Sequence, residues 1–254
     1  MAQNVPGPVA VARLIAEGWR AIKIEPPPGD PLEALCKPWY DELHRGVAIE
    51  RLDLKSTDGM ARLKTLLATA DVFLASQRPS ALARLGLDHA SLTSQFATLR
   101  HVNIVGDTAN PEEPGHDLTY QARAGLLHGA MPATLVADMA GAERAHAVIK
   151  SVMLQPGAHV VIGLYDTLRD LAAPLRFGLT ARGGVLGGGN PAYAIYAARD
   201  GAIAVAALEP HFRKRLYDGL ALPDGADPAA VFLTRTATEW EAWAAARDIP
   251  LVAM

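Results

Sequence analysis

The sequence has little cysteine, no excess of basic residues and no long apolar run. Cys36 is the single cysteine among 254 residues, so no disulfide can form within the chain, and we predict a reducing, cytoplasmic compartment. The formal net charge is -3 without a run of Lys or Arg, which argues against nucleic-acid or anionic-membrane partners. No apolar stretch approaches the roughly 20 residues that span a bilayer. The opening MAQNVPGPVAVARL also lacks a signal-peptide pattern.

Several chemical motifs are absent as well. The eight histidines are scattered, with no HxxxH and no cysteine partner, so the sequence predicts no metal site. There is no GxSxG nucleophile motif and no GxxxxGK[ST] phosphate loop. The glycines at 183–189 do not follow a strand as GxGxxG should, which argues against a dinucleotide fingerprint. We read this cluster as a mobile loop that closes over a ligand.

What the chain does contain is alternating strand and helix patterns. Half of the residues are apolar and a fifth are charged, which is typical of a folded globular protein. The order predicts an α/β fold, a Rossmann-like and mainly parallel sheet flanked by helices. Strands are expected at 19–25, 49–54, 71–76, 100–106 and 158–164, and helices at 8–17, 58–69, 80–86, 89–96, 138–154 and 165–177.

The composition shifts at residues 178–191, which hold six of the 22 glycines. Beyond this segment the pattern predicts a hairpin over 192–208, followed by helices at 210–220 and 236–248. We therefore predict a large domain over 1–182 and a small α+β domain over 183–254.

His116 is the first candidate for chemistry. It lies in the segment after the fourth strand, and ligands of parallel sheets bind beyond the carboxyl ends of the strands. Histidine is the commonest general base because its ordinary pKa lies near neutral. A buried packing histidine and a helix-start residue are the alternative interpretations.

Three carboxylates accompany this histidine. We expect Asp138 to cap a helix that runs from Met139 onward, where the helix dipole and backbone donors would hold the carboxylate ionised as a base or nucleophile. Asp117 is expected to be another cap. Glu209 lies between a strand and a helix headed by Pro210, as a cap or as a group that orients His116.

Six blocks in chain order resemble one family. They are IKIEPPPGDPL, HRGVAIERLDLKSTDG, ADVFLASQRPSALARLGL, GHDLTYQARAGLL, VADMAGA and NPAYAIYAARDGAIAVAALEPHF. Together they are similar to the family III CoA-transferases of the CaiB/BaiF type, and most of all to the α-methylacyl-CoA racemase branch.

The resemblance implies an interlocked homodimer whose acyl-CoA site lies between domains of different subunits. It also implies that His116 and Asp138 exchange protons with the α-carbon of the thioester, and that Glu209 pairs with the histidine. In the transferase branch the same aspartate carries the acyl group. CoA enters as part of the substrate, and no further cofactor is implied.

The resemblance also implies that residues of the matching blocks contact CoA. These are Leu52, Asp53, Leu54 and Lys55 of the LDLK block, Arg84 of the RLG block, and Gly115, Asp117 and Tyr120 around the histidine.

Three functions are open on this evidence. Racemase or epimerase chemistry on 2-methylacyl-CoA is preferred, because His116, Asp138 and Glu209 are all present. The second is CoA transfer between carboxylic acids through an acyl group on Asp138. The third is a relative, shortened at both ends, that binds CoA without turnover.

Overall fold

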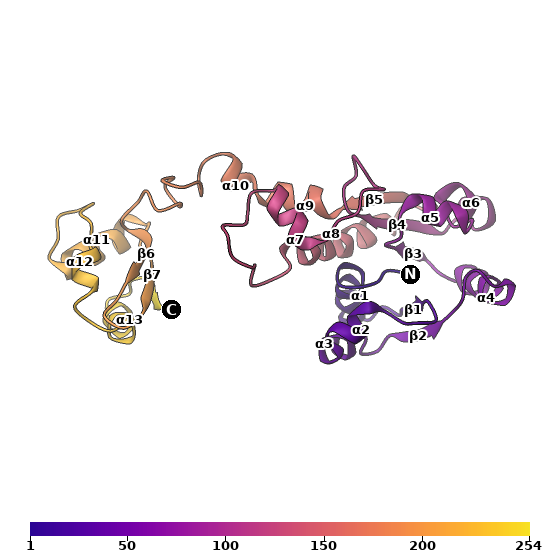
Figure 1. Cartoon of the computed structure of the whole chain (residues 1–254), viewed down its shortest axis with the longest axis horizontal. Coiled ribbons are helices and arrows are strands. Elements are labelled where there is room, and N and C mark those ends of the chain that lie inside the picture. The colour runs from indigo at the N-terminus through magenta and orange to yellow at the C-terminus, as the bar shows by residue number, and fades with distance from the viewer. The chain divides into compact units, whose positions relative to one another are not determined.

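The computed structural model describes residues 1–254, which form two compact units, Met1–Leu171 and Ala172–Met254 (Figure 1). The glycine cluster and residues 172–182 therefore belong to the second unit. No helix combines the length and the apolar character needed to cross a membrane.

The first unit alternates strands and helices, as the sequence pattern predicts. Its elements are α1 (Pro6–Ala16), β1 (Ile22–Glu25), α2 (Pro31–Leu35), α3 (Lys37–Leu43), β2 (Ala48–Arg51), α4 (Thr57–Leu67), β3 (Val72–Ala75), α5 (Pro79–Arg84), α6 (His89–Gln95), β4 (Arg100–Val105), α7 (Asp117–Arg123), α8 (Val136–Val152), β5 (His159–Gly163) and α9 (Leu164–Leu171). All strand pairs in this unit are parallel. The α/β class with parallel sheets between helices is thus confirmed.

The parallel strands form two sheets instead of one. The pair β1-β2 is separate from the three-stranded sheet β3-β4-β5. Residues 1–3 cover the free edge of β3, because the Met1 ammonium donates to the Leu74 carbonyl at 2.9 Å and the Gln3 amide donates to Ser76 Oγ at 3.0 Å.

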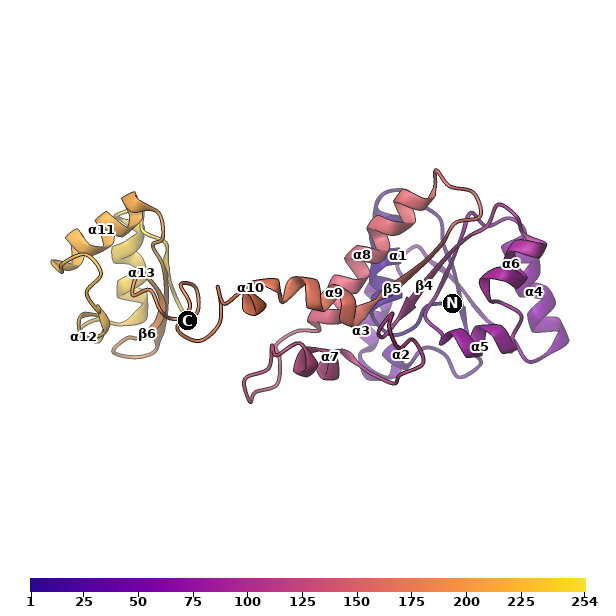
Figure 2. The same cartoon turned by 90° about the horizontal axis from the view of Figure 1, so that it is seen from above.

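Helices cover both faces of the three-stranded sheet. On one face α1 and α8 pack over Val102, Ile104 and Ile162. On the other face α4, α5 and α6 pack with Phe73 and Ala75 of β3. Figure 2 shows α5 and α6 on the opposite side of β4 and β5 from α8. Both faces of the sheet are therefore buried, so a ligand site is expected at the ends of the strands.

The second unit has its own sheet and core. It contains α10 (Ala173–Arg176), β6 (Tyr193–Ala197), β7 (Ala202–Ala206), α11 (Pro210–Leu220), α12 (Ala229–Phe232), α13 (Ala237–Ala245) and β8 (Leu251–Ala253). The strands form an antiparallel sheet in the order β6-β7-β8. Phe232, Trp240 and Trp243 fill the core, and the Trp240 indole donates to the Phe232 carbonyl at 2.7 Å.

Several elements were not predicted. Helices α2, α3 and α12 are too short for a helical period to stand out in the sequence. The start of α2 depends on Asp30, whose side chain accepts a hydrogen bond from the Leu32 amide. Strand β8 exists because Leu251–Ala253 pairs with the distant β7, which is a tertiary event.

Candidate active site

A cavity of about 310 Å³ opens in the first unit at the carboxyl ends of β3 and β4. Residues 76–78 follow β3, residues 104–106 end β4, and the segment 111–116 leads into α7. The starts of α8 and α9 contribute Asp138 and Leu164. The cavity thus lies at the edge where parallel sheets bind their ligands.

His116 stands at the entry of α7. Its backbone is extended, with φ -140° and ψ 166°, and its amide donates to Thr119 Oγ1 at 3.1 Å. The Thr119 hydroxyl in turn donates to the His116 carbonyl at 2.8 Å. These two bonds satisfy the backbone N–H and carbonyl groups of His116 at the helix start. The His116 side chain is exposed and lines the cavity, so the interpretation as a buried packing histidine is wrong.

Asp138 lines the same cavity but does not cap its helix. Helix α8 begins at Val136, and Leu135 occupies the N-cap position without a side-chain hydrogen bond. Asp117 instead accepts hydrogen bonds from the first turn of α8: its Oδ1 atom accepts the backbone N–H groups of Ala137 at 2.6 Å and of Asp138 at 3.0 Å. The prediction that helix amides hold Asp138 ionised is wrong. Burial, and then the Asp117 charge, raise the pKa of Asp138 to about 7.

Tyr120 forms one wall of the cavity together with two glycines. A Cβ atom at Gly106 would stand 2.2 Å from the Tyr120 hydroxyl oxygen, and one at Gly115 would stand 2.5 Å from Tyr120 Cε1. A side chain at either position would require the Tyr120 ring to move. Burial, and then the charge of Asp138, raise the pKa of the Tyr120 phenol.

The sequence reasoning missed Arg78. This guanidinium side chain precedes α5 and lines the cavity, as do Gln77 and Ser76 beside it. Their position directly after a strand, at its carboxyl end, is the signal that could have identified them.

The remaining predicted CoA contacts lie elsewhere. Leu52, Asp53, Leu54 and Lys55 follow β2, and Asp53 and Lys55 are exposed. The Asp53 carboxylate accepts a hydrogen bond from the Lys55 amide at 3.0 Å. Arg84 is exposed in the last turn of α5. None of these residues lines the cavity of His116 and Asp138, and their contact with CoA stays a prediction.

Glu209 belongs to the second unit. It occupies the N-cap position of α11, its side chain is exposed, and it makes no capping hydrogen bond. In the same unit a second cavity, of about 810 Å³, is lined by Gly187, Gly188 and Gly189 together with residues of β6 and β7. The glycine segment therefore borders a hollow, and its closure over a ligand stays a prediction.

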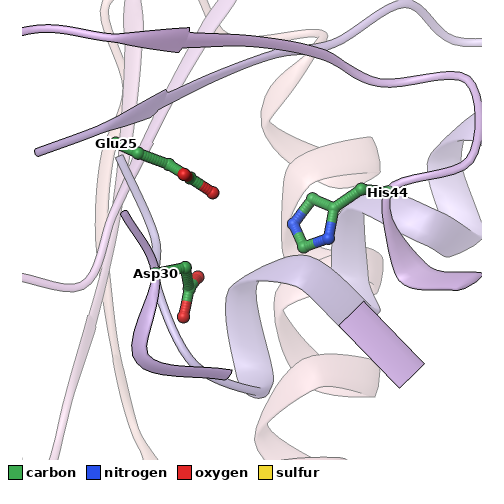
Figure 3. Close-up of side chains that lie close together, drawn as sticks. All are labelled: Glu25, Asp30 and His44. Atoms are coloured by element: carbon green, nitrogen blue, oxygen red, sulfur yellow. The ribbon is translucent and has the colours of Figure 1, made fainter. Parts of the chain in front are cut away.

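The structure also brings together three potential metal ligands that share no sequence motif. The side chains of Glu25, Asp30 and His44 are buried and turned toward one another (Figure 3). The Lys23 ammonium nitrogen lies among them, 3.1 Å from Glu25 Oε1, 2.5 Å from Asp30 Oδ2 and 2.7 Å from His44 Nε2. Within this cluster, the Lys23 ammonium group thus provides the positive charge that these three side chains contact.

A family model described as CoA-transferase family III matches residues 1–249. Alpha-methylacyl-CoA racemase from Mus musculus is 28% identical over 243 residues, which are 78% of this chain and 62% of the mouse protein. Cinnamoyl-CoA:phenyllactate CoA-transferase from Clostridium sporogenes is 34% identical over 133 residues, which are 46% of this chain and 32% of that protein. The first curated relatives are matched over 50% to 69% of their own lengths.

The fold agrees with a solved structure. A crystal structure of Rv3272 from Mycobacterium tuberculosis matches with a TM-score of 0.87 and 22% identity, covering 99% of this chain and 80% of that one. With the family model matching almost every residue, the chain belongs to CoA-transferase family III.

Proposed function

We propose that this protein exchanges the α-proton of acyl-CoA thioesters, as a 2-methylacyl-CoA racemase or epimerase. One observation supports it above all: His116 and Asp138 line a single cavity at the carboxyl ends of β3 and β4. The mouse racemase, matched over 78% of this chain, supports the same chemistry.

The reaction needs two acid-base groups that together carry one proton. One group removes the α-proton and leaves an enolate, and the other returns a proton on the opposite face of the carbon. A neutral His116 with a protonated Asp138 can start in one direction. The product state, an imidazolium with a carboxylate, starts the reverse reaction, so no proton is gained or lost overall.

The raised pKa of Asp138 suits this residue to donate a proton near neutral pH. A carboxyl group whose pKa is about 7 carries a proton in a large fraction of molecules at neutral pH and can donate it. A carboxylate that attacks a thioester must instead be ionised.

The test is incubation of a chiral 2-methylacyl-CoA in deuterated water, without an acceptor acid. We expect α-deuteration together with epimerisation at the α-carbon. His116→Asn and Asp138→Asn should each reduce exchange by at least about 100-fold, since each removes an acid-base group. The control is His128→Asn, because His128 is exposed and lies outside the cavity lining. Absence of exchange with a panel of 2-methylacyl-CoA substrates would contradict the proposal.

CoA transfer between carboxylic acids is the second candidate. The 34% identity to the clostridial CoA-transferase over 133 residues supports it. In this case turnover depends on an acceptor acid, and hydroxylamine traps an acyl group on Asp138. His116→Asn should then have a small effect, which separates the two candidates.

We further propose that Glu209 pairs with His116, that the protein is a homodimer, and that it is cytoplasmic. Light scattering of the purified chain tests the dimer. Under the racemase proposal Glu209→Gln should lower the exchange rate, because an imidazolium loses its partner.

A further inference from the structure

Asp117 links the two halves of the proposed acid-base pair. It directly follows His116, and only 3% of its surface is exposed. As described above, its Oδ1 atom accepts the amides of Ala137 and Asp138. Its Oδ2 atom accepts the Gln121 side-chain amide at 2.5 Å, and that amide also donates to the Thr134 carbonyl at 3.1 Å. One carboxylate thus bonds to α7 and to the first turn of α8.

These contacts make Asp117 the cap that α8 otherwise lacks. The side chain of Leu135, at the N-cap position, has no polar atom to accept an amide. We infer that Asp117 is a positioning residue for the proton-transfer pair: it ties the backbone at His116 to that at Asp138 and places a second negative charge beside Asp138.

The charge has a chemical consequence. Amides in the first turn of a helix ordinarily stabilise a nearby anion. Asp117 occupies two of these amides, so they are not available to Asp138. After burial, the Asp117 charge is the next cause of the raised pKa of Asp138. The arrangement therefore favours a protonated Asp138, which can give its proton to an enolate.

The other ionisable residues that line the cavity with Asp138 are Arg78, Glu113, His116 and Tyr120. Of the charged groups around Asp138, only Asp117 shifts its pKa appreciably. Removing the charge of Asp117, which lies behind the cavity lining, should therefore change the titration of Asp138 more than removing the charge of any lining residue.

The test is Asp117→Asn in the full chain. Asparagine keeps a side-chain oxygen for the amides of α8 and removes the charge, and the Gln121 amide can turn to match it. The direct readout is the carboxyl titration of Asp138, followed by NMR in protein carrying ¹³C-labelled aspartate, with Asp138→Asn to assign the signal. We expect the midpoint to fall by about one pH unit or more.

The control is Asp88→Asn. Asp88 also caps a helix, accepting from the Ser91 amide at 3.1 Å at the start of α6, and it lies outside the cavity lining. Its loss should leave the Asp138 titration unchanged. Asp117→Ala, which removes cap and charge together, should lower the thermal unfolding midpoint more than Asp117→Asn does.

The kinetic part of this inference rests on the proposed function. The whole pH profile of exchange should move to lower pH in Asp117→Asn, whereas a purely structural role would lower the rate at all pH values alike. An unchanged Asp138 titration in a folded Asp117→Asn variant would overturn the inference. A shifted titration without exchange in the wild type would support the inference and overturn the proposed function, so the two failures are distinguishable.

Discussion

Lys23 and Asp30 form a buried ion pair, with the Lys23 Nζ atom 2.5 Å from Asp30 Oδ2. Asp30 also accepts the amides of Asn4 at 3.1 Å and Leu32 at 2.9 Å. The pair therefore connects β1, the start of α2 and the segment before α1. Asn4 itself lines the cavity of His116 and Asp138, so this polar cluster supports one side of the candidate active site.

Lys23→Met should destabilise the protein strongly. It leaves the buried carboxylate of Asp30 without its cation and removes one of the two cations that pair with Glu25, which costs about 3–5 kcal/mol. Urea unfolding at pH 7 measures the change. The matched control is Lys37→Met, since Lys37 forms an exposed pair with Asp41, and such pairs contribute little to stability. Equal effects of the two substitutions would contradict the role of the Lys23 cluster.

His101 should make the first unit sensitive to acid. Its ring is buried against Phe73 and stacked on His159, and neither ring nitrogen has a hydrogen-bond partner. Burial, and then the neighbouring His159 and His89, lower the pKa of His101 to about 4. Between pH 6.5 and pH 4 the unfolded chain binds more protons at this residue, so the free energy of unfolding falls as the pH falls. The full effect is roughly 3 kcal/mol.

The measurement is urea unfolding at pH 7 and pH 4.5. His101→Leu should lose less stability between these two pH values than the wild type, because its side chain cannot bind a proton. His128→Leu is the control, as His128 is exposed in a loop and should keep the wild-type difference. An identical loss in His101→Leu and the wild type would argue against the buried imidazole as the cause.

Gly115→Ala should distort the cavity wall. The new Cβ atom would stand 2.5 Å from Tyr120 Cε1, so the buried Tyr120 ring must move. Such overpacking costs about 1–3 kcal/mol. Under the proposed function it should also reduce exchange, because His116 follows Gly115 directly. Thermal unfolding and the exchange assay measure the two effects. Gly201→Ala, whose Cβ would meet nothing closer than 3.6 Å, should be near neutral in both.

The pH profile of the wild type should separate the two candidate reactions. Racemisation requires that His116 and Asp138 together carry one proton, so kcat/KM should follow a bell-shaped pH profile that falls when both groups are protonated and when neither is. The profile should have the same shape in both reaction directions. Acyl transfer requires an ionised Asp138, so the rate should rise through pH 7 and then stay level. Rates from pH 5.5 to 9 distinguish these shapes.

Local patterns predicted much of the fold. The alternation of short apolar strands with amphipathic helices can be recognised from patterns of neighbouring residues. The helix Pro210–Leu220, for example, agrees in both bounds with the prediction. The same reasoning anticipated that His116, which follows a strand, lies at the carboxyl edge of a parallel sheet. The line-up of six motif blocks then predicted the family.

What depends on distant residues could not be predicted. Lys23, Asp30 and His44 have no motif spacing, and they meet only because β1, α2 and α3 pack together. The protonation state of Asp138 likewise depends on residues that are distant in the sequence. The residue type and its place near a helix start were evident from the chain, but its pKa depends on burial and on the Asp117 carboxylate twenty-one residues away. Only folding sets these two quantities, because charge interactions and desolvation depend on distance in space and not on separation along the chain.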